Sequence, residues 1–140
     1  MSSDFPFSTA RSSLLNTETF RNLLGNALEN STKSVIILSA YVKTVGVNWL
    51  KEKISDKKIN CTIVTRWNNG DLAQGSSDLE CYHLAKKNNW SFKVLQDLHA
   101  KVMLVDNDIL FIGSPNLTGR GMSLVPVSNE ELGIKVKALD

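Results

Sequence analysis

Cysteine is scarce in this chain, and long apolar runs are missing from it. The two cysteines, Cys61 and Cys81, do not form a C-x-x-C pair, and so small a number excludes a disulfide framework. We interpret both as buried free thiols of a protein from a reducing compartment. No run of about 18 apolar residues occurs, so the sequence predicts no membrane-spanning helix.

The chain also lacks a strong charge of either sign. Its formal net charge is +2 without a dense run of lysine and arginine, which excludes a tail-type polycation but permits a polyanionic partner. The N-terminal stretch MSSDFPFSTARSS lacks the basic-then-apolar pattern of a secretory signal. No amphipathic stretch is typical of membrane binding. We therefore expect a cytoplasmic protein without stable membrane association.

The length and composition are those of one globular domain. The chain has 140 residues, of which 42% are apolar and 21% charged. A domain of this size buries enough surface to form a proper core. No internal repeat is present. We expect a single domain over residues 1–140, with residues 1–15 as a loose lead-in.

Hydrophobic periodicity predicts an alternation of helices and strands. Helices are expected at 17–30, 46–56 and 77–88, the last opened by a capping box of Ser77 and Glu80. A polar loop is expected at 68–75 and a Gly/Ser-rich loop at 117–127. Strands are expected at 34–40, 60–66, 90–95, 100–105, 109–112 and 131–136, with a hairpin turn at 106–108. This order predicts an α/β fold, a mixed β-sheet flanked by helices on both faces.

One group of polar residues follows the change in pattern near residue 99. His99, Lys101 and Asp106 are spaced as H-x-K-x4-D, and six residues separate Asp106 from the segment Gly113-Ser114-Pro115-Asn116. Glu131 follows 15 residues after Asn116. Because side chains alternate along a strand, His99 and Lys101 are predicted to share a face.

The predicted hairpin brings these residues together. The pairs His99–Lys101 and Ser114–Asn116 are expected to face each other near its open end, where an imidazole, an ammonium, a hydroxyl and an amide converge. That set suits a phosphodiester. The imidazole can act as nucleophile or general acid, and the ammonium and amide can donate to the phosphoryl oxygens.

The segments HAKVMLVD and GSPN resemble the HKD motif of the phospholipase D superfamily, H-x-K-x4-D with its trailing GSxN. Every motif position matches, and the resemblance covers about 40 residues directly. A looser resemblance joins TRWNNGDLAQGSSDLE to bacterial single-motif members, which include restriction-type and defence-associated nucleases. The order of helices and strands upstream is consistent with the fold of this family.

The resemblance implies a specific mechanism. In this family two copies of the motif form one active site, in which one histidine attacks phosphorus and the other protonates the leaving oxygen. Neither a metal nor another cofactor is needed. This chain has one copy, and His83 lacks a lysine two residues on. The second motif is therefore expected from another protomer of a homodimer, with His99 nucleophile in one subunit and general acid in the other.

The resemblance also assigns the remaining motif residues. Lys101 and Asn116 are expected to bind the phosphoryl oxygens, and Ser114 to support the phosphate or the histidine. The family's acidic residue that orients the histidine is expected at Glu131, with Glu130 as the alternative. Asp106 and Gly113 are expected to be structural positions of the motif.

Three further residues are candidates for substrate binding. Arg66 and Trp67 stand where a predicted buried strand runs into a loop, a common position for site residues. There Arg66 would meet a phosphate and Trp67 would stack on a base. A surface arginine and a packed tryptophan are the alternative. Arg120, just past the GSPN segment, is the third candidate.

Three functions remain open at this point. The favoured one is a metal-independent nuclease, with DNA favoured over RNA. The second is a phospholipase or phosphatidyl-transfer enzyme with the same site. The third is a non-catalytic nucleic-acid-binding module, against which the intact motif argues. Family domains continue past the last strand into a helix, so we expect either a minimal form or the catalytic part of a longer protein.

Overall fold

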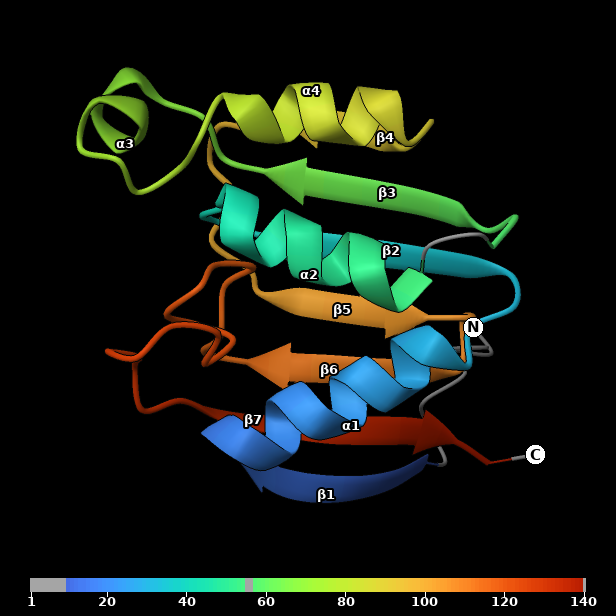
Figure 1. Ribbon diagram of the computed structural model, residues 1–140. Helices are drawn as coiled ribbons and strands as arrows, with labels where there is room; N and C mark the ends of the chain where they lie inside the picture. Colours follow the sequence, from blue (N-terminus) through green and yellow to red (C-terminus); the bar gives the residue numbers. More distant parts are fainter. Residues whose placement is uncertain (1–9, 55–56, 140) are drawn as a thin grey trace, which may run out of the picture.

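The computed structural model describes residues 10–54 and 57–139, and within them the chain forms a seven-stranded sheet with four helices (Figure 1). The sheet order is β1-β7-β6-β5-β2-β3-β4. The strands are β1 (Ala10–Asn16), β2 (Ser34–Ser39), β3 (Asn60–Thr65), β4 (Ser91–Val94), β5 (Val102–Val105), β6 (Ile109–Gly113) and β7 (Leu132–Ala138). The helices are α1 (Thr17–Glu29), α2 (Thr44–Ile54), α3 (Asn69–Ala73) and α4 (Glu80–Lys87).

The sheet is mixed, as the sequence predicts. β2, β3 and β4 run parallel, and the connections between them pass through helices because parallel neighbours need a crossover. β5 pairs antiparallel with β2, and the β5–β6 hairpin continues the sheet to β7 and β1. The carboxyl ends of β2 and β3 therefore share one edge with the beginning of β5, the end of β6 and the beginning of β7.

The hydrophobic core lies between the sheet and the long helices. Alternate residues of the central strands point into it, among them Ile37, Ile63 and Phe111, which are fully buried. Helix α1 contributes Phe20, whose ring meets that of Phe111 edge-on at 5.5 Å between centroids. A fully buried side chain of this size stabilises the fold by about 1.5–3 kcal/mol.

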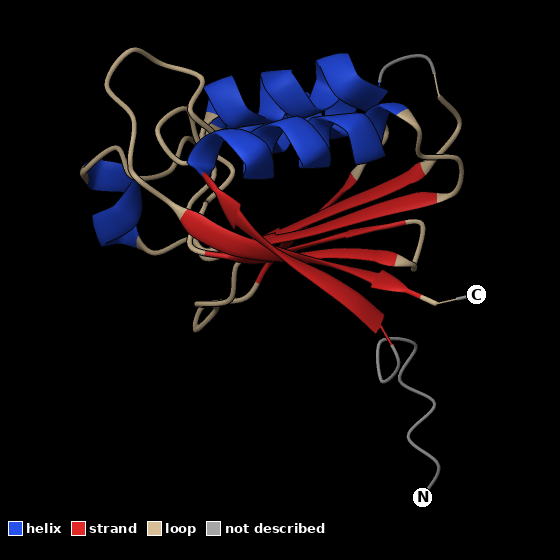
Figure 2. Cartoon of the chain, turned by 90° about the horizontal axis from the view of Figure 1, so that it is seen from below, coloured by secondary structure: helices blue, strands red, loops and turns tan. Residues whose placement is uncertain are grey.

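The expected α/β class is confirmed, but the distribution of helices differs from the expectation. Figure 1 shows α1, α2 and α4 in front of the sheet, and Figure 2 shows the long helices on one face of it; α1 contacts α2, and α2 contacts α4. No described helix covers the opposite face, which presents partly exposed apolar residues such as Ile36, Leu38 and Ile112. In β2, only every second side chain is fully buried, because the other side chains point to the face without a helix.

Two local expectations are also wrong. Residues 10–15, expected in a loose lead-in, belong to β1, which pairs with β7 and buries Leu15; residues 1–9 lie outside the described residues. The predicted polar loop at 68–75 contains the short helix α3, whose N-cap Asn68 accepts a hydrogen bond from Asp71 N–H.

The predicted capping box of Ser77 and Glu80 does not form. Helix α4 begins after Leu79, without a side-chain cap. The Ser77 hydroxyl instead accepts a hydrogen bond from the backbone N–H of Val42 at 3.2 Å. The Ser77 oxygen, which the local sequence pattern predicted as a helix cap, therefore binds Val42, a residue distant in the sequence.

The prediction of buried free thiols is confirmed for both cysteines. Cys61 and Cys81 are buried and unpaired, and burial raises the pKa of each thiol to about 12. Among the described helices, none is long and apolar enough to cross a membrane.

Candidate active site

The residues of the H-x-K and GSPN segments meet at one edge of the sheet, on the left in Figure 1. His99 and Lys101 come immediately before β5, Ser114 and Asn116 immediately after β6, and Glu131 immediately before β7. This edge also holds the carboxyl ends of β2 and β3, the position where open α/β sheets commonly bind ligands.

His99 is exposed at this edge, and no described residue hydrogen-bonds to its imidazole. The Lys101 ammonium donates to the carbonyl oxygen of His99 at 3.3 Å. The carbonyl of Lys101 accepts from Gly113 N–H at 3.4 Å, which joins this segment to the hairpin. Because β5 begins only at Val102, strand alternation does not fix the directions of the His99 and Lys101 side chains, contrary to the expectation.

Ser114 and Glu131, which the resemblance assigned to separate roles, are hydrogen-bonded to each other. The Ser114 hydroxyl donates to Oε2 of Glu131 and accepts from Leu132 N–H at 3.0 Å. The other carboxylate oxygen of Glu131 accepts from the Asn129 amide at 3.0 Å. The backbone N–H of Glu131 donates to the Thr17 hydroxyl at 2.7 Å, so the start of α1 also holds this residue. The carboxylate of Glu131 therefore binds Ser114 and Asn129 within one chain. Glu130, the alternative, is exposed.

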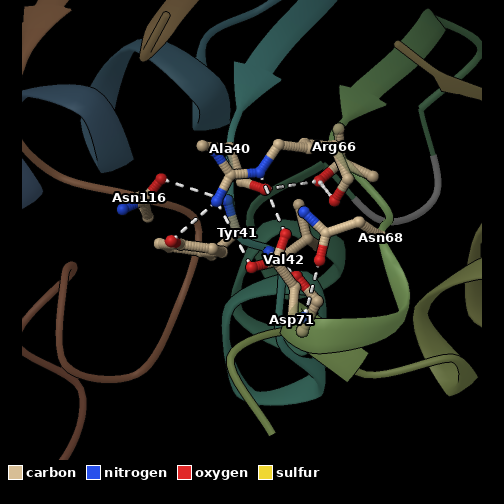
Figure 3. Close-up of polar contacts among 9 residues, drawn as sticks. Ala40, Tyr41, Val42, Arg66, Asn68, Asp71 and Asn116 are labelled. Atoms are coloured by element: carbon tan, nitrogen blue, oxygen red, sulfur yellow. Dashed lines mark hydrogen bonds and ion pairs between the residues drawn. The ribbon is translucent and has the colours of Figure 1, made fainter. Parts of the chain in front are cut away.

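The amide of Asn116 has a defined orientation (Figure 3). Its Oδ1 accepts from the backbone N–H of Tyr41 at 3.2 Å, and the Ser39 hydroxyl lies 3.3 Å away. Since a backbone N–H can only donate, the atom that faces it must be the amide oxygen. The Nδ2 group is then left to donate elsewhere, and no described residue accepts from it.

Ser39 and Tyr41 were not among the residues predicted for the site. Ser39 is fully buried; its hydroxyl donates to Tyr41 O at 2.6 Å and accepts from Leu117 N–H at 2.8 Å. These bonds tie the end of β2 to the segment that carries Asn116. The signal available in the sequence was position alone, because both residues stand at the carboxyl end of a buried strand.

Arg66 is engaged within the protein. Its Nε donates to Asp71 at 2.9 Å and its Nη2 to the Tyr41 hydroxyl at 2.7 Å (Figure 3). The guanidinium carbon also lies 5.0 Å from the centroid of the Tyr41 ring. The hydrogen bond to Asp71 is the main cause that raises the pKa of Arg66. Arg66 thus holds Tyr41 next to Asn116, and a phosphate contact remains a prediction.

Trp67 and Arg120 differ in their surroundings. Trp67 packs on Phe92 at 4.9 Å between ring centroids, and its indole N–H is buried without a described partner. This packing agrees with the alternative in which Trp67 is a packed tryptophan. Arg120 is exposed and lines a cleft beside Asn116, and no described residue binds its guanidinium.

Asp106 lies at the far end of β5, away from this edge. Its carboxylate accepts hydrogen bonds from the backbone N–H groups of Thr32, Lys33 and Ser34 at 2.8–3.2 Å. Burial opposes its ionisation, but these donors and the charge of Lys33 outweigh burial and lower its pKa. The geometry supports a structural role in joining the hairpin turn to the start of β2.

Gly113 is constrained by its neighbour across the sheet. It pairs with Gly133, and a Cβ atom on Gly113 would lie 2.5 Å from both the Gly133 Cα and the Leu132 carbonyl oxygen. No larger residue fits without moving β6 away from β7, the strands that bring Ser114 to Glu131.

The cleft beside Asn116 has a volume of about 650 Å³. It lies between the end of β2, the start of α2, residues 74–76 and the loop after β6. Its polar lining includes Tyr41, Lys43, Gln74, Asn116, Arg120 and Asn129. In the part of the chain that the structure describes, no group of three or more His, Cys, Asp or Glu residues is placed to hold a metal ion.

Residues 24–139 match the protein family described as "Cardiolipin synthase, PLD-like domain". The match spans most of the chain, so this protein belongs to the phospholipase D-like family. No curated protein sequence matches the chain. The family supports a function of the phosphodiesterase type.

Solved structures show the same fold at low sequence identity. NucT from Helicobacter pylori is 18% identical with a TM-score of 0.69, covering 91% of this chain and 86% of NucT. Nuc from Salmonella typhimurium, a phospholipase D family member, is 15% identical with a TM-score of 0.72, covering 93% and 84%. Phosphatidylserine synthase from Haemophilus influenzae is 12% identical with a TM-score of 0.70, covering 91% of this chain but 34% of that enzyme.

Proposed function

We propose that this protein is a metal-independent nuclease that hydrolyses DNA through a phosphohistidine intermediate. The observation that supports this most strongly is the orientation of Asn116, whose amide oxygen faces Tyr41 N–H and whose Nδ2 is free to donate to a phosphoryl oxygen. The exposed imidazole of His99 and the ammonium of Lys101 lie at the same edge of the sheet.

The chemistry proceeds in two balanced steps. A neutral imidazole nitrogen of one His99 attacks phosphorus, and the bond from phosphorus to the leaving oxygen breaks. The second histidine gives that oxygen its proton. That histidine, now neutral, removes a proton from water; the resulting hydroxide displaces the first imidazole and leaves a phosphate monoester. Lys101 and Asn116 donate to the phosphoryl oxygens as their charge grows.

The second histidine comes from a second copy of the chain. The sequence contains His83 and His99 only, and the ring of His83 lies on α4 against Tyr82, 5.5 Å between centroids. A two-fold axis near His99 would bring two such residues to one site. Within this dimer, Glu131 is available to orient a histidine through its free lone pairs, in addition to holding Ser114.

A lipid substrate is the second candidate, because the matching family is described as a cardiolipin synthase domain and one protein with the same fold is a phosphatidylserine synthase. The cleft beside Asn116 argues for nucleic acid, since among its described lining residues only Val45 and Val125 offer larger aliphatic side chains to an acyl chain.

A comparison of the two substrate classes tests the proposal. Labelled single-stranded DNA and short-chain phosphatidylglycerol are incubated separately with the protein in excess EDTA. We expect cleavage of DNA and no release of lipid headgroup. Release of headgroup without DNA cleavage would replace the nuclease by the lipid-acting enzyme, and DNA binding without either reaction would favour the non-catalytic module.

A further inference from the structure

The charged residues that line the cleft beside Asn116 are positive. Among the described residues that line it, Lys43 and Arg120 are the cationic ones, and none is an aspartate or a glutamate. A concave surface with positive charge and no acid attracts an anionic ligand. Because Asn116 forms part of the same wall, this anion would adjoin the scissile phosphate rather than occupy a remote surface.

The two cations are not equally available. The ammonium of Lys43 donates to the carbonyl oxygen of Gly75 at 2.7 Å and lies 3.9 Å from the Asp78 carboxylate. Arg120 is exposed, and among described residues none binds its guanidinium. Its planar donors fit two phosphate oxygens at once. Arg120 is therefore the better placed of the two to bind a phosphate.

The rest of the lining is suited to hydrogen bonding. Gln74 and Asn129 add amide groups, and Tyr41 adds a half-buried ring at the end of β2. Amide groups can both donate to and accept from the edge of an unpaired base, and an aromatic ring offers it a stacking surface. A volume of about 650 Å³ is within the usual range for pockets that bind small molecules.

We propose that this cleft binds the nucleotide next to the scissile phosphate, with Arg120 on that nucleotide's own phosphate and the amide groups on its base. The proposal rests on the proposed nuclease function and extends it: Asn116 contacts the reacting phosphate, whereas Arg120 contacts the next one along the strand. Substrates with a flanking nucleotide should therefore be preferred over minimal diesters.

Kinetics on two substrates test this assignment. Wild type, Arg120→Gln and the control Arg11→Gln are assayed with a short single-stranded oligonucleotide and with bis(p-nitrophenyl) phosphate, which has no flanking nucleotide. Arg11 matches Arg120 in charge and exposure but lies near the beginning of β1, opposite Lys137 at the end of β7 and far from the site. For Arg120→Gln, the ratio of kcat/KM for the oligonucleotide to that for the small diester should fall about tenfold. The ratio should not change for Arg11→Gln.

Binding without turnover separates this proposal from the nuclease itself. Fluorescein-labelled oligothymidylate is titrated into His99→Ala, with and without Arg120→Gln, at several salt concentrations. Loss of one phosphate contact should raise Kd about tenfold and reduce the slope of log K against log salt by about 0.7. Arg11→Gln in the same background should leave both quantities unchanged.

Each outcome of these two experiments supports or overturns the assignment of the cleft to a nucleotide. Equal effects of Arg120→Gln and Arg11→Gln would overturn the proposal, as would equal losses on both substrates. If wild type cleaves no DNA, the nuclease proposal fails, and the binding titration still decides whether the cleft takes a nucleotide. Weaker binding of Arg120→Gln to phosphatidylglycerol vesicles, with unchanged oligonucleotide binding, would assign the cleft to a lipid headgroup and overturn it.

Discussion

Asn116 illustrates how one neighbour can set the chemistry of a side chain. Its carbonyl end is fixed by the backbone of Tyr41, so its NH2 end is directed to the site. Asn116→Asp keeps the size and the acceptor for Tyr41 N–H, but replaces the donor by a carboxylate that repels phosphate. We expect kcat to fall by about 10²–10³-fold, the usual cost of removing one such donor.

Stability and activity must be measured together for this variant. Urea unfolding should give a free energy close to that of wild type, because the Tyr41 contact persists. Asn48→Asp, an exposed change on α2, controls for the added charge and should retain wild-type kcat. Full activity of Asn116→Asp would show that this amide does not bind the phosphoryl group.

Asp106 gives a prediction about pH. Its pKa is lowered in the folded state, so it favours folding above its unfolded pKa of about 3.9, and this stabilisation is lost as pH falls through the folded pKa. Asp106→Asn should lower the free energy of unfolding by about 1–3 kcal/mol at pH 7, since hydrogen bonds to a charged group are lost. The difference from wild type should shrink below about pH 4.

Denaturant unfolding across pH checks this expectation. Asp108→Asn changes the same charge in the same turn, where no described residue binds the carboxylate of Asp108, and should behave as wild type. A difference between Asp106→Asn and wild type that stays constant from pH 7 to pH 3 would contradict the charge-based explanation.

The sequence predicted the residues of the motif but not their supports. His99, Lys101, Ser114 and Asn116 were identified from their spacing, and Glu131 from the resemblance to the family. The structure brings all five to one edge of the sheet. Several of the supporting hydrogen bonds involve backbone groups, such as the N–H groups of Tyr41 and Leu117, and the residue types alone do not reveal these contacts. For this reason the contribution of β2 to the site could not be predicted from side-chain pattern.

At the scale of elements, the glycine pair of β6 and β7 sets how closely α1 approaches the site. A Cβ on Gly133 would lie 2.5 Å from the ring of Phe20, which also packs on Phe111. Gly133→Ala should therefore displace Phe20 and lower the free energy of unfolding by about 1–3 kcal/mol.

A matched substitution shows whether the destabilisation by Gly133→Ala comes from lack of space or from the loss of glycine's backbone freedom. Gly70 lies in α3, where the nearest atom to an added Cβ is 3.4 Å away. Gly70→Ala should be neutral or stabilising by up to about 1 kcal/mol in urea unfolding. Equal destabilisation by both variants would mean that close packing against Phe20 is not the cause.

Elements with strong periodicity were predicted well, and those that depend on tertiary partners were not. The apolar runs of β2 and β3 and the stripe of α1 specify their own conformation. β1 was missed because it is stabilised by pairing with β7, more than 100 residues away in the sequence. Its own residues show no clear strand pattern. The sequence of a single strand likewise does not show whether a helix covers each face of the sheet.

At the scale of the whole molecule, a site shared by two copies makes a quantitative prediction. Wild type and His99→Ala are mixed in equal amounts, unfolded in urea and refolded together. If both copies contribute His99 to each site, only dimers of two wild-type chains are active. Random pairing makes about one quarter of the dimers of this kind, so the mixture has about one quarter of the activity of the same total amount of wild-type protein. Independent sites would leave about one half.

The metal-independent nuclease is tested most directly by nicking of supercoiled plasmid in excess EDTA at low salt, with wild type and His99→Ala compared. We expect nicking by wild type and a rate at least about 10³-fold lower for His99→Ala, because the variant loses both nucleophile and general acid. Equal nicking by the two proteins, or nicking by wild type that EDTA abolishes, would contradict a phosphohistidine mechanism centred on His99.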